Sequence, residues 1–419
     1  MLSTIVSFFI ALFITMLIVR FAHKSTRMLD FDLESIQKIH AMPVPRIGGL
    51  GIYLASVFGC LTLYLQTPAA GLWTAMLLFS GFAAFGCGIV EDFTKNMSPR
   101  RRLILTMVSA TVAFFLLDAK IERVDVPVLD LCLSYIWLSL PLTIFAVAGV
   151  ANAVNIIDGF NGLAGAVTMF MLLSLAYVAF QVGDTHVMSA ALIMVGAIAG
   201  FLIWNYPHGL IFMGDGGAYF IGFMLAELVV LLIARNPSVS AWYAVLLLIY
   251  PVVETIFSIY RRKFVRGVSP GLPDGIHLHM LIFKRLVRWT VGARDARALT
   301  RRNAMTSPYL WLLSAMAVIP ATLFWSNTWI LAPMCFVFIS SYVWLYAQIV
   351  RFNVPAWLIL RKRKRSRLAA HPSAGPLPVP LVEVKGNTYV GGQDESDADI
   401  RRLQTHPRAP AMSQKVANE

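Results

Sequence analysis

Charged residues are scarce in this chain. They make up 14% of its 419 residues, whereas hydrophobic residues make up 58%; soluble domains are about a quarter charged. This composition excludes a disordered chain, a coiled coil and the two or three soluble domains that the length would otherwise suggest.

Cysteine is also rare, and several common functional fingerprints are missing. The four cysteines lie in apolar runs without metal-type spacing, so we expect them only to pack, and a disulfide scaffold is excluded. The chain has no P-loop, no Rossmann fingerprint and no Ser/His/Asp order. It also has no internal repeat, which weighs against the inverted-repeat architecture of many secondary transporters.

Long apolar runs dominate what is present. A helix needs about 20 apolar residues to cross a bilayer. Eleven segments approach this length: 2–20, 47–66, 71–90, 103–118, 131–150, 162–181, 187–205, 217–234, 239–260, 308–325 and 329–350. The sequence therefore predicts an all-α polytopic integral membrane protein with about 11 transmembrane helices. Segment 103–118 is the weakest of them, because it is short and rich in Ser and Thr.

The basic residues are distributed very unevenly between the connecting segments. If eleven segments span, one side receives 32 of the 35 Lys and Arg residues, and the other receives only Lys120, Arg123 and Arg235. Because Lys and Arg accumulate on the cytoplasmic side of membrane proteins, we expect a cytoplasmic C-terminus. The net charge of +13 then indicates membrane lipids or an anionic substrate as partners, and no nucleic acid.

The last part of the chain has a different composition. We interpret 1–350 as the transmembrane domain and 351–419 as a basic, largely disordered cytoplasmic tail. The run 361–367 contains six basic residues in seven positions, and we expect it to lie on anionic lipid headgroups.

Polar clusters lie in segments assigned to the cytoplasmic side. The first runs from Lys38 through His40 and Arg46 to Gly48 and Gly49. Its glycines allow close backbone approach, and Arg46 stands at a helix start, where we expect it to face an anion. An ordinary juxtamembrane loop is the alternative explanation.

The second cluster is the acidic pair Glu91 and Asp92, followed by Arg100–Arg102. Adjacent carboxylates suit a divalent cation, and they also raise one another's pKa, as a proton acceptor requires. The alternative is a helix end that pairs with the nearby arginines.

The third and fourth clusters combine polar side chains with glycines. Asn152, Asn155, Asp158 and Asn161 repeat every three residues, and a break at the intervening glycines would gather them on one side. The string 214–217, Gly-Asp-Gly-Gly, opens a helix, where free N–H groups can bind phosphate. Its acid, Asp215, would then require a bridging metal.

The fifth cluster contains His277 and His279 in a long basic loop. A structural role is the alternative for this pair, and zinc is disfavoured because no cysteine is nearby. Together the clusters predict one cytoplasmic-side site with carboxylates, amides, histidines and cations. That chemistry suits metal-assisted phosphoryl transfer between an anionic donor and a lipid.

The order and spacing of these clusters resemble the polyprenyl-phosphate N-acetylhexosamine-1-phosphate transferase family over residues 1–350. The matching positions are Lys38, His40, Pro43, Pro45, Arg46, Gly48, Gly49, Glu91, Asp92, Asn152, Asn155, Asp158, Gly159, Asn161, Gly162, Leu163, Gly214, Asp215, Gly217, Pro273, Asp274, His277 and His279. The chain departs from the family pattern at four of its positions. Glu91 and Asn161 stand where the family has Asp, Ala218 stands where it has Ser, and Met280 replaces a His. Asn161 cannot act as a base.

The resemblance implies a bacterial inner-membrane enzyme that transfers N-acetylhexosamine-1-phosphate, GlcNAc-1-phosphate above all, from a UDP-sugar to undecaprenyl phosphate and releases UMP. It assigns Mg²⁺ or Mn²⁺ to Asp215 and Glu91, and proton transfer or a further metal contact to Asp92. Asp158, Asn152 and Asn155 would orient the nucleotide sugar. Phosphate charge would be held by His277, His279 and Arg46, and the remaining substrate contacts would come from Lys38, His40, Asn161 and Gly214.

Several alternatives stay open. The donor could be UDP-GalNAc, a UDP-6-deoxy-HexNAc or UDP-MurNAc-pentapeptide, although the His-Leu-His-Met spacing favours the GlcNAc-type branch. The product could enter O-antigen, capsule or wall-polymer synthesis. A homodimer is one of the open oligomeric states, and a secondary transporter is the alternative class.

Overall fold

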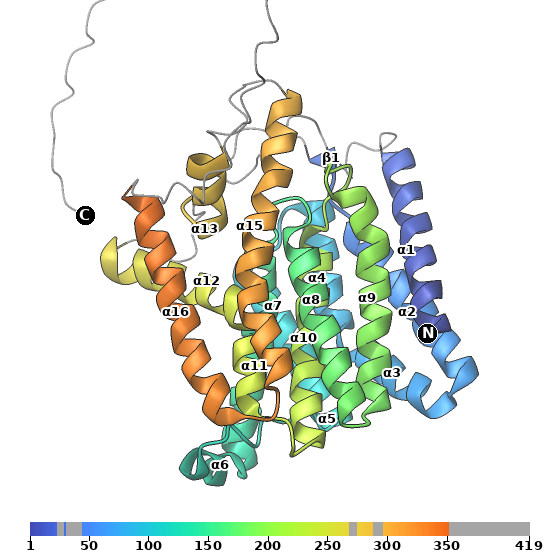
Figure 1. The fold of residues 1–419 in the computed structure, drawn as a ribbon. Helices are drawn as coiled ribbons and strands as arrows, with labels where there is room; N and C mark the ends of the chain where they lie inside the picture. The colour runs from blue at the N-terminus through green and yellow to red at the C-terminus, as the bar shows by residue number, and fades with distance from the viewer. Residues whose placement is uncertain (23–28, 31–43, 268–274, 288–295, 352–419) are drawn as a thin grey trace, which may run out of the picture. The chain divides into compact units, whose positions relative to one another are not determined.

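The computed structural model describes residues 1–22, 29–30, 44–267, 275–287 and 296–351 (Figure 1). All of them belong to one compact unit, residues 1–363. Lys38, His40, Pro43, Pro273, Asp274 and residues 352–419 of the proposed tail lie outside the described residues.

The described chain is almost entirely helical. Its helices are α1 Leu2–Phe21, α2 Gly48–Gln66, α3 Pro68–Ser80, α4 Phe82–Thr94, α5 Pro99–Leu116, α6 Pro127–Leu133, α7 Ile136–Ile157, α8 Leu163–Gln181, α9 Thr185–Asn205, α10 Gly214–Arg235, α11 Ala241–Leu247, α12 Ile249–Tyr260, α13 Leu278–Leu281, α15 Ala296–Leu323 and α16 Thr328–Val350. Two π-helical turns, η3 Arg261–Val265 and η4 Ile282–Val287, follow α12 and α13. The strands β1 Leu29–Asp30 and β2 Val44–Pro45 form one short antiparallel pair.

The prediction of a multi-spanning helical protein is confirmed, but the count of eleven spans is not. Eight described helices are long and apolar enough to cross a membrane. Two bent pairs, α3 with α4 (46°) and α11 with the continuous α12 and η3 (67°), raise the total to ten at most. The predicted span that is missing from these ten is 103–118. It corresponds to α5, which begins Pro99-Arg100-Arg101-Arg102. These arginines lower the mean hydropathy of a helix of only 18 residues.

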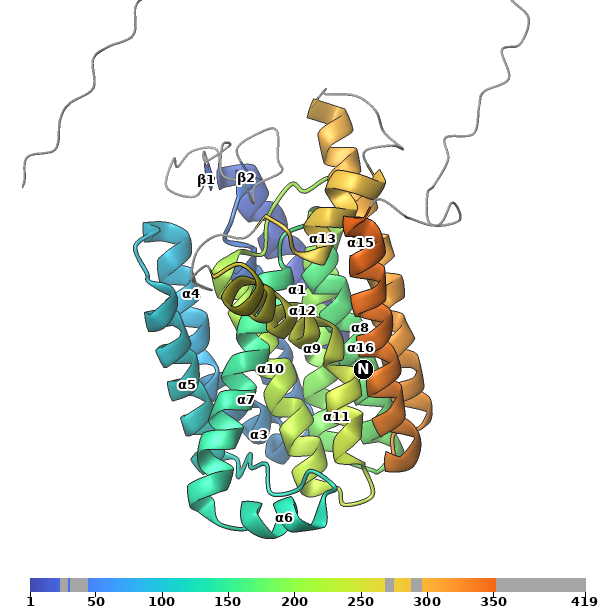
Figure 2. The same cartoon turned by 90° about the vertical axis from the view of Figure 1, so that its left-hand side faces the viewer.

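Helix α10 forms the centre of the bundle. Every residue from Gly214 to Leu232 is buried, and α4, α7, α2, α8 and α9 surround it (Figures 1 and 2). Gly222 allows α7 to approach closely, because a Cβ at this position would lie 2.8 Å from the Ala151 Cα. The residues that begin α10 are therefore fixed by contacts on all sides.

Small residues also set the contact between α1 and α9. Gly196 and Gly200 of α9 are four residues apart, and a Cβ on either would overlap a backbone carbonyl oxygen of α1, at Thr4 or Phe8. Helices in lipid associate through such close packing, because the apolar solvent supplies no hydrophobic driving force.

The two ends of the bundle differ in character. The ends of α4, α7 and α9 and the start of α10 lie at the same end as β2 and α13, whereas α6 lies at the opposite end (Figures 1 and 2). Three of the four cysteines are buried as expected, but Cys132 on α6 is exposed, so the expectation that all four only pack is wrong for that residue. At the opposite end, Asp125 Oδ2 accepts hydrogen bonds from Ser240 Oγ, the Ala241 N–H and Thr328 Oγ1 at 2.8–2.9 Å.

Candidate active site

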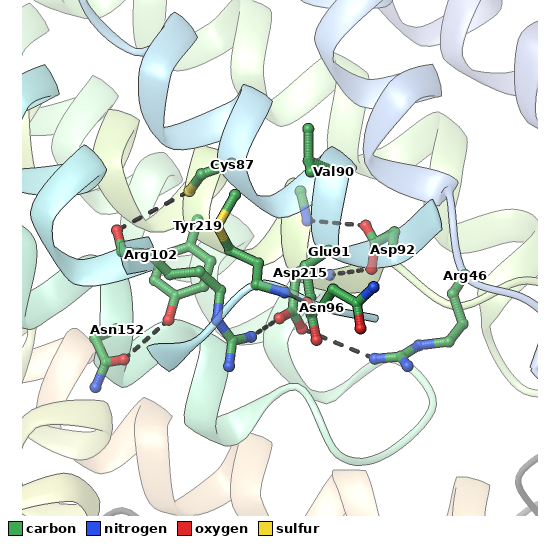
Figure 3. A network of polar contacts seen from close by, with 12 residues as sticks. Arg46, Cys87, Val90, Glu91, Asp92, Asn96, Arg102, Asn152, Asp215 and Tyr219 are labelled. Atoms are coloured by element: carbon green, nitrogen blue, oxygen red, sulfur yellow. Dashed lines mark hydrogen bonds and ion pairs between the residues drawn. The ribbon is translucent and has the colours of Figure 1, made fainter. Parts of the chain in front are cut away.

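Asp92, near the end of α4, caps the start of α10. Its Oδ1 accepts the Asp215 N–H at 2.8 Å and its Oδ2 accepts the Gly216 N–H at 3.0 Å (Figure 3). A helix N-terminus carries unpaired N–H groups and favours negative charge. The sequence predicted that free N–H groups at this helix start could bind phosphate. In the structure, the N–H groups of Asp215 and Gly216 already donate to Asp92.

Glycines in α2 and α4 let these two helices pack closely against the glycine-rich start of α10. A Cβ on Gly49 or Gly88 would overlap the backbone of α10 at Gly217 or Gly216, respectively. The Gly48 and Gly49 N–H groups donate to the carbonyls of residues 212 and 213 at 3.0 and 2.8 Å. The close backbone approach predicted for Gly48 and Gly49 is therefore confirmed, and α2, α4 and α10 meet at one point.

Asp215 lies between two arginines (Figure 3). Its Oδ2 forms an ion pair with Arg102 Nη1, and its Oδ1 lies 3.8 Å from Arg46 Nη2. The expectation that Arg46 faces an anion is confirmed. The Asp215 side chain is 13% exposed and that of Arg46 is 25% exposed, so this cluster can be reached from outside the bundle.

Glu91 and Asp92 are adjacent in sequence but make different contacts. Glu91 Oε2 accepts the Met97 N–H at 2.7 Å, which closes the turn after the left-handed residue Lys95. Both oxygens of Asp92 accept N–H groups of α10. The pair therefore tethers the end of α4 in two directions.

Asn152 and Asn155 approach the same region from α7. The Tyr219 hydroxyl donates to Asn152 Oδ1 at 3.1 Å and also interacts with Asn155. The Arg102 guanidinium lies over the Tyr219 ring, 5.9 Å from its centroid. Tyr219 thus connects the two amides to the arginine that pairs with Asp215.

Asp158 follows the last residue of α7, where the predicted break occurs. The loop 158–162 ends at Gly162, whose φ of 71° is a left-handed conformation that favours glycine. Burial raises the pKa of Asp158 to about 7, although the nearby Arg46 guanidinium lowers it. Asp158 also interacts electrostatically with Asp92, so the third cluster joins the first two.

Helices α9 and α15 hold this loop in place. Asn205 Oδ1 accepts the Gly162 N–H at 2.6 Å, and Trp311 Nε1 donates to the Gly162 carbonyl at 3.0 Å. Asn303 and Ser307 of α15 bond the backbone N–H and carbonyl of Asn161 at 2.8 and 2.6 Å. The Asn161 side chain is itself buried and donates to the Pro207 carbonyl at 3.3 Å. Its direct contacts are therefore with the protein.

The described part of the histidine loop, residues 275–281, lies against the loop 158–162. We call residues 275–281 the histidine turn. His277 and His279 are buried and their rings stack in parallel with centroids 5.2 Å apart. The His279 ring meets Phe160 edge-on at 5.6 Å, and its Nε2 would lie 3.5 Å from a Cβ on Gly159. All five sequence clusters thus converge at one end of the bundle, as far as their described residues go.

A metal at these carboxylates would have to be held mainly by substrate. No group of three or more His, Cys, Asp and Glu suited to a metal occurs among the described residues. Mg²⁺ often binds through one or two carboxylates, with phosphate and water completing its shell. The residues that would hold such a metal are Asp215, whose carboxylate lies between two arginines, and Glu91, whose Oε2 already accepts the Met97 N–H. For Asp215 to bind a metal, its ion pair with Arg102 would have to break.

Several important residues escaped the sequence clusters. Tyr219, Asn205 and Trp311 contact the site from otherwise apolar helices, and Asn303 lies in the polar start of α15, directly after two arginines. Glu254 of α12, which bonds His277, is a buried acid in the apolar run 239–260. The rule that acids at membrane depth are functional could have identified Glu254.

Comparisons with known proteins identify relatives of this chain. The model of glycosyl transferase family 4 matches residues 74–233. A probable undecaprenyl-phosphate N-acetylglucosaminyl 1-phosphate transferase of Bacillus subtilis (strain 168) is 29% identical over 281 residues, 66% of this chain and 75% of the relative. The decaprenyl-phosphate N-acetylglucosaminephosphotransferase of Mycobacterium tuberculosis (strain ATCC 25618 / H37Rv) is 31% identical over 304 residues, 63% of this chain and 72% of the relative. A phospho-N-acetylmuramoyl-pentapeptide-transferase of Caldicellulosiruptor bescii is 30% identical over 244 residues, 55% of this chain and 74% of the relative.

Proposed function

Because the chain belongs to glycosyl transferase family 4 and is a sugar-phosphate transferase, we propose that it transfers N-acetylhexosamine-1-phosphate from a UDP-sugar to undecaprenyl phosphate and releases UMP. GlcNAc-1-phosphate is the proposed group, since two of the relatives above are named for N-acetylglucosamine. The observation that carries the proposal is the position of Asp215 between Arg102 and Arg46 at the end of a membrane bundle.

In the proposed reaction an oxygen of the lipid phosphate attacks the β-phosphorus of the UDP-sugar, and the bond from that phosphorus to UMP breaks. Arg46 and Arg102 would hold the charge of the diphosphate, because guanidinium groups bind phosphate oxygens well. Asp158 and the amides of Asn152 and Asn155 would orient the nucleotide sugar. A phosphate monoester has its second pKa near 6, so the acceptor is largely ionised at neutral pH and needs little help from a base.

The divalent cation belongs to the proposal as well. Asp215 and Glu91 would hold Mg²⁺ or Mn²⁺, and the bound ion would neutralise diphosphate charge. Asp92, which caps α10, would keep Asp215 in place.

We also propose that the site faces the cytoplasm of a bacterial cell, because the Lys and Arg residues concentrate in the segments on that side. Cys132 provides a test, because it is the exposed one of the four cysteines and lies on α6 at the opposite end. A membrane-impermeant maleimide added to intact spheroplasts is expected to label Cys132. Labelling that requires lysis of the inner membrane would reverse the orientation.

The transfer itself is tested with the purified full-length enzyme, undecaprenyl phosphate, Mg²⁺ and one radiolabelled UDP-sugar at a time. Label in the lipid together with equimolar UMP is expected with UDP-GlcNAc, and Asp215→Asn serves as the inactive control. Transfer only from UDP-GalNAc, a UDP-6-deoxy-HexNAc or UDP-MurNAc-pentapeptide would reassign the donor. No lipid-linked product from any donor with folded enzyme would overturn the proposal. An active enzyme would start the lipid-linked synthesis of a cell-surface polysaccharide.

A further inference from the structure

Tyr219 of α10 is a buried residue that connects two parts of the candidate active site. It is 2% exposed and stands one turn after Asp215 on the same helix. Its hydroxyl donates to Asn152 Oδ1 at 3.1 Å (Figure 3) and also interacts with Asn155, both on α7. Buried hydroxyls are normally hydrogen-bonded, and here the bond joins the helix of Asp215 to the helix of the two amides.

This hydrogen bond fixes which end of the Asn152 amide faces Tyr219. A hydroxyl has one proton to donate, and that proton needs an acceptor. The Arg102 guanidinium, 5.9 Å from the centroid of the Tyr219 ring, carries donors alone and cannot take it. The oxygen of the Asn152 amide accepts the proton instead, so the NH₂ group at the other end of the amide is left for another partner.

The NH₂ group of Asn152 is available to a ligand. Asn152 is half-buried, and within the described part of the chain its side chain makes the Tyr219 bond and no other. A nucleotide sugar presents mainly oxygen atoms, in its phosphates, hydroxyls and carbonyls, and these oxygens need donors. The last torsion of an Asn side chain is broad and roughly two-fold, so an unrestrained amide could present its oxygen instead. The bond from Tyr219 excludes that orientation.

We propose that Tyr219 is a positioning residue, which holds the Asn152 amide so that its NH₂ group donates to an oxygen of the nucleotide sugar. This inference rests on the proposed function, because the nucleotide sugar is the donor substrate of that reaction. Tyr219 is too deeply buried to touch the substrate, so it acts through Asn152. Loss of its hydroxyl should therefore weaken binding of the nucleotide sugar and leave binding of the lipid acceptor unchanged.

A merely structural role would consist of tying α10 to α7 and supporting Arg102. Tyr219→Phe helps to separate the two roles, because it keeps the aromatic ring under Arg102 and removes only the hydroxyl. The matched control is Tyr243→Phe in α11. Tyr243 is also fully buried, and its hydroxyl is hydrogen-bonded to Ser174 Oγ at 3.0 Å. Both changes remove one buried hydroxyl, but Tyr243 bonds a serine of α8 rather than an amide of the site.

The binding experiment uses purified full-length protein, Mg²⁺ and radiolabelled UDP-GlcNAc, and it compares the wild type with Tyr219→Phe, Asn152→Ala, the double variant and Tyr243→Phe. We expect Tyr219→Phe to raise the Kd for UDP-GlcNAc about three- to tenfold, the effect of one lost hydrogen bond. The Kd of Tyr243→Phe, and the KM of Tyr219→Phe for undecaprenyl phosphate, should stay within about twofold of the wild type. The double variant should bind no more weakly than Asn152→Ala. Multiplying losses in the double variant, or wild-type affinity in Tyr219→Phe, would overturn the proposal.

A second readout needs no substrate. In the infrared spectrum, the C–O stretching band of a tyrosine reports whether its hydroxyl donates a hydrogen bond. Subtracting the spectrum of Tyr219→Phe from that of the wild type isolates the Tyr219 band, and the same subtraction in the Asn152→Ala background shows this band without its acceptor. We expect the band to shift between the two backgrounds. An unshifted band would overturn the positioning role whatever the reaction, and the expected shift in a protein that transfers from no UDP-sugar would overturn the proposed function alone.

Discussion

Asp92 fixes the backbone of Asp215, because its Oδ1 accepts the Asp215 N–H at 2.8 Å. An acid at the end of α4 thereby determines where the acid that opens α10 stands. The two residues are 123 positions apart in the sequence, and the glycines at their crossing let the helices come close enough for the bond. Asp92 therefore positions the backbone at the start of α10, whereas the carboxylate of Asp215 is left to contact Arg46 and Arg102.

Replacing these two acids should affect different properties. We expect Asp92→Asn to weaken the cap and to destabilise the protein by about 1–2 kcal/mol, because an amide offers one acceptor oxygen in place of two. Asp215→Asn should abolish transfer and change the melting temperature little, since its backbone bond remains. Thermal unfolding in detergent, measured beside turnover, checks both. A stable Asp92→Asn enzyme with normal turnover would contradict the capping role.

The loop that carries Asp158 offers a graded test. Asp158→Asn should abolish transfer while the protein still inserts into the membrane. Trp311→Phe removes the bond to the Gly162 carbonyl and keeps an aromatic ring, so turnover should fall only several-fold, with a loss of about 1 kcal/mol in stability. Assays of both variants at matched membrane protein levels check this order. Full activity in Asp158→Asn would remove that residue from the catalytic group.

The α1–α9 contact should be intolerant of added volume. Gly196→Val places side-chain atoms where the Thr4 carbonyl lies, so we expect a lower melting temperature and proteolysis of α1. Gly149→Ala is the matched control, because a Cβ there meets nothing within 4 Å and alanine favours a helix by about 1 kcal/mol. Limited proteolysis and thermal unfolding distinguish the two. Equal stability of both variants would show that the close approach is unimportant.

A pH effect on stability is expected at the opposite end of the bundle. Burial alone would raise the pKa of Asp184, but bonds from Arg235, the Val187 N–H and Asn236 lower it below its ordinary value. A lowered pKa means that the ionised acid stabilises the fold above about pH 4, the unfolded value. This stabilisation is lost as the pH falls through the folded pKa.

As the pH falls below about 4, the melting temperature of the wild type should therefore fall more steeply than that of Asp184→Asn. Arg235→Gln should flatten the profile in the same direction, because it removes the cationic partner. Parallel profiles for all three proteins would show that this pair does not contribute.

The helical membrane fold could be predicted from the sequence, and so could the polar clusters that meet at one end of the bundle, because the signals for both are local. Blocks of apolar residues identify spans, and Asp158 and Asp215 stand beside glycines in short strings. The pairing of Asp92 with α10 could not be predicted in this way, since it depends on how two helices cross. The number of spans was uncertain because α5 begins with three arginines. Asn205 and Trp311 could not be assigned to the site, because each is isolated in an apolar helix.

The contacts of α16 bear on how the enzyme matures. Tyr342 binds Glu254, and the carbonyls of Ile349 and Val350 accept bonds from Arg285, just beyond the histidine turn. These links cannot form until α16 has entered the membrane, after every other described helix has been synthesised. The histidine turn therefore gains these contacts only after α16, the last of the described helices, has inserted, and a nascent chain halted before α16 lacks them.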